Sequence, residues 1–159
     1  MAESATFSSP SAAETWDAIV VGAGAAGLMA AAVAAGRGRR TLLLEKNQRP
    51  GIKILMSGGT RCNLTQATDA PGIIAAYGRS GRFLRAALGR LDPDGLVALV
   101  EAEGVPTKVE PTGKIFPASD RAEDVLGAFM RRLTRSGATL ALGEPLQAIE
   151  RLPDDGSHG

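Results

Sequence analysis

Short apolar runs and one alanine-rich stretch define the beginning of the chain. Residues 17–21 (DAIVV) are mostly apolar and β-branched and end at a glycine, which predicts a buried parallel strand. The alanine-rich residues 27–37 predict a helix that stops at glycines and arginines, and residues 41–45 (TLLLE) predict a second buried strand. Together these elements predict a βαβ unit with a right-handed crossover.

Helical periodicity returns in residues 80–91. Phe83 and the neighbouring leucines recur on one face of this stretch, whereas Arg82, Arg85 and Arg90 fall on the other. The pattern predicts an amphipathic helix whose arginines form an ordinary solvated face.

A further helix and a hairpin are predicted next. Asp92 followed by Pro93 is typical of an N-cap with proline at the first helical position, and the apolar pattern that follows ends at Gly104. Residues 107–109 and 114–116 flank a Pro-Thr-Gly turn, which predicts a small β-hairpin.

The last third of the chain predicts one helix and two strands. Asp120 with Glu123 resembles a capping box that opens an amphipathic helix, which ends at Gly137. Residues 139–142 and 146–150 have the short apolar pattern of strands.

The length of 159 residues suits one domain. Residues 1–15 are small and polar and predict a disordered leader, residues 16–152 form the predicted domain, and residues 153–159 form a polar tail. The leader lacks the basic and apolar regions of a signal peptide, so we expect a cytoplasmic protein. Residues 18–36 carry no charge, but they are mainly alanine and glycine and do not predict a membrane span.

Composition excludes several kinds of site. The net charge of +1 gives no electrostatic reason to expect a nucleic acid or a membrane as a partner. Cys62 is the only cysteine, which excludes an internal disulfide. His158 is the only histidine and lies one residue from the end of the sequence, which argues against a histidine-based metal site and a Ser-His-Asp triad. We therefore expect a cofactor to supply the chemistry and identify no catalytic side chain.

The turn between the first strand and the first helix has the spacing G-x-G-x-x-G over residues 22–27. Gly22 permits the tight turn, Gly24 allows the backbone to approach a pyrophosphate, and Gly27 allows the helix to pack closely on the strand. The N-terminus of the helix that follows offers free N–H groups and a positive dipole to phosphates, and Ala25 and Ala26 of the turn lie directly before it.

Glu45 ends the second strand about 20 residues after the glycine turn, at the position where an acid accepts hydrogen bonds from a ribose diol. An acid here also repels a 2′-phosphate, which disfavours a phosphorylated nicotinamide nucleotide. The alternatives are a glycine-rich turn that binds nothing and a domain that binds only NAD. Residues 47–65 distinguish them, because a loop rich in glycine, hydroxyls and cations can wrap along an extended dinucleotide and suits FAD.

The stretch EKN…GIKILMSGGTRCNLT, with KIFPASDRAEDVL downstream, resembles the bacterial NAD(P)/FAD-dependent oxidoreductases of the aminoacetone oxidase-like flavoprotein family, which includes bile-acid dehydro-reductases. The resemblance covers about residues 16–150. The matching positions are Gly51, Lys53, Ser57, Gly58, Gly59, Arg61, Cys62, Asn63 and Thr65. The chain departs from the pattern at Ile52, where arginine is usual, and at Thr60, where glycine is usual.

The resemblance implies FAD as the cofactor and a set of contacts to it. The cofactor-binding residues expected from the glycine turn and the resemblance are Gly22, Gly24, Ala25, Ala26, Gly27, Glu45, Lys46, Lys53, Ser57, Gly58, Gly59, Arg61, Asn63 and Leu146. Arg61 is predicted either to clamp an anion or to brace the loop. Cys62 has no partner cysteine or neighbouring histidine, which favours a packed thiol over a redox thiol.

The resemblance also implies a longer protein, because its members are more than twice this length. We therefore expect a Rossmann-like α/β fold with an incomplete parallel sheet, the N-terminal part of a two-domain flavoprotein. The intact enzyme would transfer a hydride between a small organic substrate and a nicotinamide nucleotide or oxygen. The alternative is a dinucleotide-binding module without catalysis. Taken alone, the chain is expected to be marginally stable, to expose apolar sheet edges and to bind FAD weakly or not at all.

A flavoprotein that modifies tRNA shares the glycine turn and is a further alternative. The nearly neutral charge and the lack of a basic stripe in the sequence disfavour it.

Overall fold

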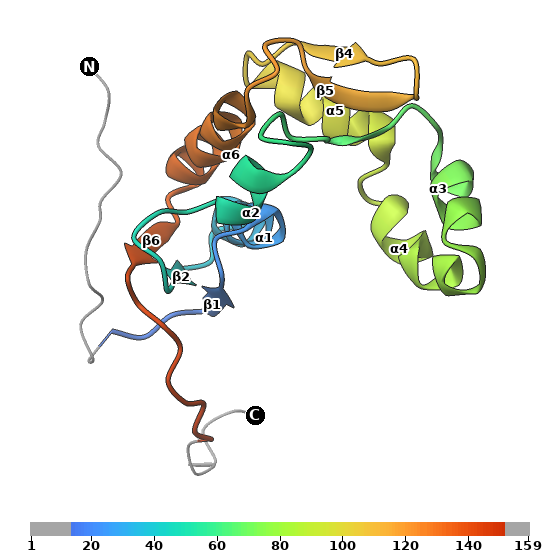
Figure 1. Ribbon diagram of the computed structural model, residues 1–159. Helices are drawn as coiled ribbons and strands as arrows, with labels where there is room; N and C mark the ends of the chain where they lie inside the picture. The colour runs from blue at the N-terminus through green and yellow to red at the C-terminus, as the bar shows by residue number, and fades with distance from the viewer. Residues whose placement is uncertain (1–13, 152–159) are drawn as a thin grey trace.

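The computed structural model describes residues 14–151, so the predicted polar tail and nearly all of the predicted leader lie outside the described residues. Figure 1 shows a small parallel sheet with helices on one side, a second sheet beyond them, and a helical segment projecting from the far end. The elements, in chain order, are β1 (Ala18–Val21), α1 (Ala25–Gly36), β2 (Thr41–Glu45), α2 (Ile52–Met56), β3 (Thr65–Gln66), α3 (Ala70–Ala76), η1 (Gly78–Leu84), α4 (Arg85–Leu88), α5 (Pro93–Ala102), β4 (Thr107–Val109), β5 (Lys114–Pro117), α6 (Ala122–Ser136) and β6 (Thr139–Leu142).

The parallel sheet has the order β1-β2-β6 and confirms the predicted Rossmann-like α/β class. Leu43 in the middle of β2 lies opposite Val20 of β1 and Leu140 of β6. Helices α1 and α6 contact each other and share one buried cluster with β2 and β6, in which Leu28 and Val125 are almost fully buried. Apolar side chains of α1 and α6 thus pack on one face of the parallel sheet and cover it.

Strand β1 pairs as predicted but is buried on one face only. Ile19 and Val21 are each 56% exposed, whereas Val20 packs against the core. Within residues 14–151, β1 is an edge strand, and alternate side chains of a strand point to opposite faces. The prediction of a buried strand was therefore wrong for the face that carries Ile19 and Val21.

The second sheet is antiparallel, with the order β3-β5-β4. Strands β4 and β5 form the predicted hairpin, and the short β3 adds a strand that the sequence pattern did not predict. Phe116 of β5 is buried and anchors this sheet. Helix α5 begins where predicted, because the Asp92 carboxylate accepts a hydrogen bond from the Gly95 amide at 2.7 Å.

The prediction of one amphipathic helix over residues 80–91 was wrong. The chain instead forms α3, the 3-10 helix η1 and the short α4, and Phe83 is 90% exposed. Gly78 has a left-handed backbone (φ +56°), and a Cβ at Gly81 would lie 2.0 Å from the Ile74 carbonyl oxygen. These glycines permit a tight reversal that an uninterrupted helix could not make.

The predicted capping box at Asp120 was also wrong. Arg121 is the N-cap of α6, and Asp120 has a left-handed backbone with φ 56°. Its carboxylate pairs with Lys108 and lies 3.4 Å from the Arg61 guanidinium. Two cations thus hold Asp120 toward the second sheet and away from the helix start.

The second strand predicted after α6, at residues 146–150, is absent from the described structure. The Gly143 and Glu144 amides still donate to Asn47 and Glu45 carbonyls, but Pro145, which has no N–H group, follows immediately. Ile149 is 85% exposed. The chain therefore leaves the sheet at this proline.

A buried carboxylate joins α5 to α6. The Glu103 side chain is only 4% exposed, and Arg135 donates to it at 2.9 Å and through a second, shorter contact. Arg131 donates to the Glu103 carbonyl at 2.7 Å. The Arg135 hydrogen bond outweighs burial and lowers the pKa of Glu103.

We predict that Glu103→Gln lowers the free energy of unfolding by about 1 to 2 kcal/mol at neutral pH, because it removes a charge-assisted acceptor from a buried position. Since the folded-state pKa is lowered, this contribution is complete above the ordinary glutamate pKa of about 4.3 and is lost as pH falls through the folded value. Urea unfolding at several pH values measures the contribution of Glu103 to the free energy of unfolding. The control is the Glu150→Gln variant, which changes an exposed glutamate. Equal stability of the two variants at neutral pH would contradict the assignment.

Candidate functional site

The glycine turn joins β1 to α1 in the conformation that its spacing predicts. Gly22 has φ +96°, and its amide donates to the Leu44 carbonyl at 2.7 Å, which ties the turn to β2. A Cβ on Gly27 would lie 1.8 Å from the Gly22 carbonyl oxygen. Gly27 therefore allows the first turn of α1 to contact the strand end directly.

Helix α1 directs its N-terminus into open space. Gly24 is the N-cap with φ −79° and ψ −177°, and its carbonyl accepts the Leu28 amide at 2.9 Å. The amides at the start of a helix have no acceptor within the helix, and the first turn of α1 has no acidic residue. A Cβ added at Gly24 would have no atom within 4 Å. The turn thus forms a cradle whose free N–H groups can donate hydrogen bonds to an anion.

Glu45 at the end of β2 is buried and supports this cradle. Its Oε2 accepts a hydrogen bond from the Ala23 amide at 2.8 Å, and its Oε1 accepts from the Asn47 amide at 2.9 Å and the Asn47 side chain at 2.6 Å. Burial raises the pKa of Glu45, but the hydrogen bonds from Asn47 and Ala23 and the charge of Lys46 outweigh it, so the net shift is downward. The carboxylate is held ionised beside the turn.

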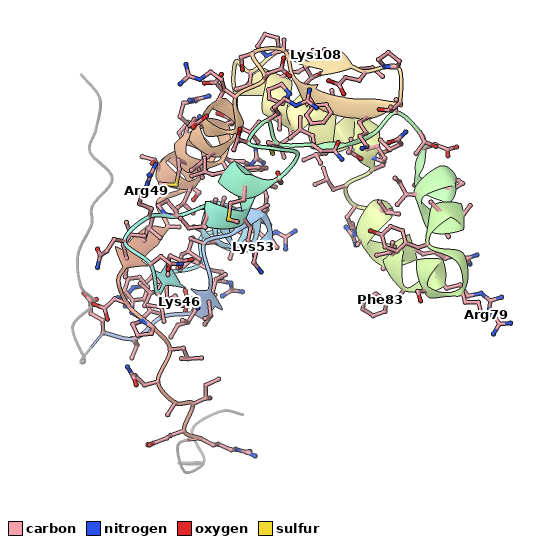
Figure 2. The ribbon with its side chains drawn as sticks, viewed as in Figure 1. Lys46, Arg49, Lys53, Arg79, Phe83 and Lys108 are labelled. Carbon is pink, nitrogen blue, oxygen red and sulfur yellow. The ribbon has the colours of Figure 1, made fainter. Side chains whose placement is uncertain are left out.

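The segment after β2 closes against the turn. The Gly51 amide donates to the Ala23 carbonyl at 2.8 Å, and a Cβ on Gly51 would lie 2.4 Å from Leu126 of α6. Residues 51–65 were predicted as a loop, but they begin with the short helix α2. Figure 2 shows Lys46 beside the end of β2 and Lys53 on α2.

These features surround one cavity of about 1120 Å³. Eleven of the fourteen predicted cofactor-binding residues line it. They are Gly22, Gly24, Ala25, Ala26, Gly27, Glu45, Lys46, Lys53, Ser57, Asn63 and Leu146. The structure therefore brings the glycine turn, the acid after β2 and most of the loop to one site.

Gly58, Gly59 and Arg61 are not among the residues that line the cavity. Gly58 has φ +57°, and a Cβ there would lie 2.8 Å from the Asn63 amide nitrogen, so Gly58 shapes the loop. The Arg61 guanidinium lies 2.5 Å from Glu110 and 4.1 Å from the centroid of the Phe116 ring. Of the two predicted roles for Arg61, this geometry favours bracing the loop over binding an anion.

Cys62 lies at the cavity wall as a packed thiol. The residue is 6% exposed, and its amide donates to the Ser57 carbonyl at 3.0 Å. Burial raises the pKa of the Cys62 thiol. The thiol is therefore protonated at neutral pH, as expected for a structural rather than a redox cysteine.

Sequence reasoning missed the apolar side of the cavity. Leu91, Leu96 and Phe129 line it from the start of α5 and from α6, and Glu144 and Pro145 line it beside Leu146. In the sequence, Leu91, Leu96 and Phe129 belong to apolar helical patterns that predict only core positions. Tertiary packing brings them to this site.

The part of the chain that the structure describes holds neither a metal-binding cluster nor a helix that could span a membrane. No three histidine, cysteine or acidic side chains there come together to hold a metal ion. None of the helices within residues 14–151 has the length and apolar character needed to span a bilayer.

Curated relatives match most of this chain. It is 33% identical over 138 residues to "Ribosomal RNA dihydrouridine synthase" of Escherichia coli, covering 87% of this chain and 34% of the relative. The protein of the same name from Haemophilus influenzae is 30% identical over 137 residues, covering 86% of this chain and 33% of the relative. The chain thus spans about a third of the length of these relatives.

The fold also resembles a solved structure. Thermovibrio ammonificans THI4 matches with a TM-score of 0.52 at 17% identity, over 80% of this chain and 37% of that chain. The family described as HI0933-like protein Rossmann domain matches residues 16–157, which is nearly the whole chain. The chain therefore belongs to the HI0933-like protein Rossmann domain family, whose cofactor is FAD.

Proposed function

We propose that the chain binds FAD along the cavity described above and forms the FAD-binding part of an oxidoreductase. One observation carries the proposal: the open glycine cradle, the buried acid after β2 and the segment that closes over them line a single cavity. The residues fit the cofactor because the position where a Cβ of Gly24 would lie is empty, and Gly24 is the N-cap of a helix whose first amides have no acceptor within the helix.

The adenosine and pyrophosphate parts of FAD have natural positions in this arrangement. The amides of Ala25 and Ala26 at the N-terminus of α1 would bind the pyrophosphate. Glu45 Oε2 accepts one hydrogen bond from Ala23, and a carboxylate oxygen can accept about two, so it retains capacity for a ribose hydroxyl. Leu146 lines the same cavity and would contact the adenine side.

The rest of the cavity would orient the flavin end. Lys53, Ser57 and Asn63 supply donors and acceptors along one wall, and apolar side chains from α5 and α6 supply the other. An apolar wall excludes water and so strengthens the polar contacts. When bound, FAD supplies the hydride-transfer chemistry, for which this chain carries no dedicated side chain among the described residues.

We propose two candidate reactions for the whole protein. The first is transfer of a hydride between a small organic substrate and a nicotinamide nucleotide or oxygen, as in the aminoacetone oxidase-like and bile-acid-reducing enzymes that the sequence resembles. A dinucleotide-binding module without catalysis stays the alternative for the chain taken alone.

The second candidate is the reduction of a uracil base in RNA, which the names of both curated relatives favour. This reaction adds a hydride and a proton across the ring double bond and consumes a reductant such as a reduced nicotinamide nucleotide. The net charge of +1 argued against a nucleic-acid partner, but net charge averages over the whole chain and conceals local patches.

Glu45→Gln tests the proposed site. The glutamine amide group would face the Ala23 or Asn47 donors, so the turn loses an acceptor and the ribose loses its charged partner. We expect FAD to bind about tenfold more weakly than to the unmodified chain, measured by fluorescence quenching of FAD. Glu150→Gln removes the same charge from an exposed position and should leave the affinity unchanged. Equal FAD affinity of both variants would contradict the placement of FAD at Glu45.

A further inference from the structure

The segment from α3 to the start of α5 is strongly basic. Residues 70–91 contain four arginines and no acidic residue, although the whole chain has a net charge of only +1. The four are Arg79, Arg82, Arg85 and Arg90. The rest of the chain is therefore net acidic, and the positive charge is concentrated in this segment.

These arginines are exposed and unneutralised. All four are exposed, and none forms an ion pair within residues 14–151. By contrast, the arginines at 61 and 135 are held by carboxylates. The four exposed guanidinium groups remain free to bind an external anion.

Two exposed aromatic side chains lie among the arginines. Tyr77 is 63% exposed and Phe83 is 90% exposed. Figure 2 shows Arg79 and Phe83 at the end of the projecting helical segment. Phe83 is hardly covered by any residue within 14–151, so the apolar helix face to which the sequence pattern assigned it does not explain it.

We propose that residues 77–90, with Arg79, Arg82, Arg85, Arg90, Tyr77 and Phe83, form a docking surface for single-stranded RNA. Guanidinium groups bind phosphates, and exposed aromatic rings stack on unpaired bases, which is the combination that single-stranded nucleic acid requires. An acidic protein would satisfy the arginines but would not require aromatic rings between them. The proposal rests on the RNA substrate class proposed above.

The position of the surface suits delivery of a base to the cavity. Arg90 directly precedes Leu91, which lines the proposed FAD cavity. An enzyme that modifies a base must bind the strand beside its site and bring the base out of the stack. The basic segment is thus continuous along the chain with one wall of that cavity.

Binding of a fluorescein-labelled, unstructured oligouridylate of about 16 nucleotides to the full chain tests the proposal by fluorescence anisotropy at several salt concentrations. Arg79→Gln/Arg82→Gln should weaken binding about tenfold and reduce the salt slope by about 1.4, the value for two lost phosphate contacts. The matched control is Arg37→Gln/Arg39→Gln, which removes two exposed arginines after α1 and should leave binding unchanged.

The aromatic contribution has its own variant. Phe83→Ala should weaken binding about tenfold through lost stacking, whereas Ile149→Ala, an equally exposed apolar truncation, should not. Because both side chains are solvent-exposed, neither change should affect the melting temperature.

Three results would overturn the proposal: no RNA binding by the unmodified chain, equal losses in the patch and control variants, or full affinity in Phe83→Ala. Displacement of the RNA by polyglutamate at equal charge would show instead a surface for acidic proteins. FAD affinity is measured on the same samples. FAD binding without RNA binding contradicts only this inference, whereas RNA binding without FAD binding contradicts only the proposed cofactor function.

Discussion

Gly27→Ala is expected to abolish the folded state of the nucleotide-binding unit. The new methyl group would lie 1.8 Å from the carbonyl oxygen and 3.0 Å from the carbonyl carbon of Gly22. Both are backbone atoms that no side-chain rotation can move, so α1 would have to separate from the end of β1. We expect a loss of about 4 kcal/mol or more, a large part of the stability of a small domain.

Circular dichroism and thermal unfolding measure this effect without any cofactor. Gly36→Ala is the matched control, since Gly36 ends the same helix and a Cβ there would have no atom within 4 Å. The control should unfold at the same temperature as the unmodified chain or slightly higher. A Gly27→Ala variant that unfolds cooperatively at the temperature of the control would contradict the close contact between α1 and the turn.

Gly24→Ala is expected to leave the fold intact, unlike Gly27→Ala, and to cause a large loss of FAD affinity. Its backbone angles, φ −79° and ψ −177°, are accessible to alanine, and a Cβ there meets no protein atom within 4 Å. The methyl group would instead occupy the space proposed for the pyrophosphate. We expect the FAD affinity to fall about 100-fold, because the phosphates can no longer approach the helix amides.

Equilibrium titration with FAD and thermal unfolding without FAD separate the two effects. Gly24→Ala and Gly36→Ala should melt together, and only Gly36→Ala should bind FAD as the unmodified chain does. If Gly24→Ala bound FAD normally, the pyrophosphate would not lie over this glycine, whatever the stability of the variant.

The nucleotide-binding core was predictable because its determinants are close in sequence. The apolar runs gave β1 and β2 within one residue of their observed bounds, and the glycine spacing located the turn. The role of Gly27 followed from the spacing alone, since a close strand-to-helix turn leaves no room for a Cβ. The hairpin of β4 and β5 was predictable for the same reason, because a local turn determines it.

Features determined by distant contacts were not predictable. Arg61 was open to two roles, and Glu110, 49 positions later in the chain, favours one of them. Asp120 has the spacing of a cap, but Lys108 and Arg61 hold its carboxylate elsewhere. The apolar pattern at residues 80–91 suggested burial, but no described element covers Phe83. In each case tertiary contacts, or their absence, overrode the local pattern.

One side of the candidate site was predictable from the sequence and the other was not. The polar side, with the glycine turn and Glu45, follows from short motifs. The apolar side, with Leu91, Leu96 and Phe129, depends on how α5 and α6 pack across the cavity. Helical periodicity alone cannot distinguish a cavity wall from an ordinary core face.

Equilibrium dialysis of the 159-residue chain against FAD tests the central claim most directly. The sequence led us to expect weak or absent binding by this chain alone. Because the glycine turn, Glu45 and the segment after β2 already line one cavity, we predict weak but saturable binding of one FAD per chain. The flavin absorbance bands should shift from those of free FAD, and NADP⁺ should bind more weakly still. Unchanged flavin bands and no saturable uptake by a folded chain would contradict the claim that this cavity is an FAD site.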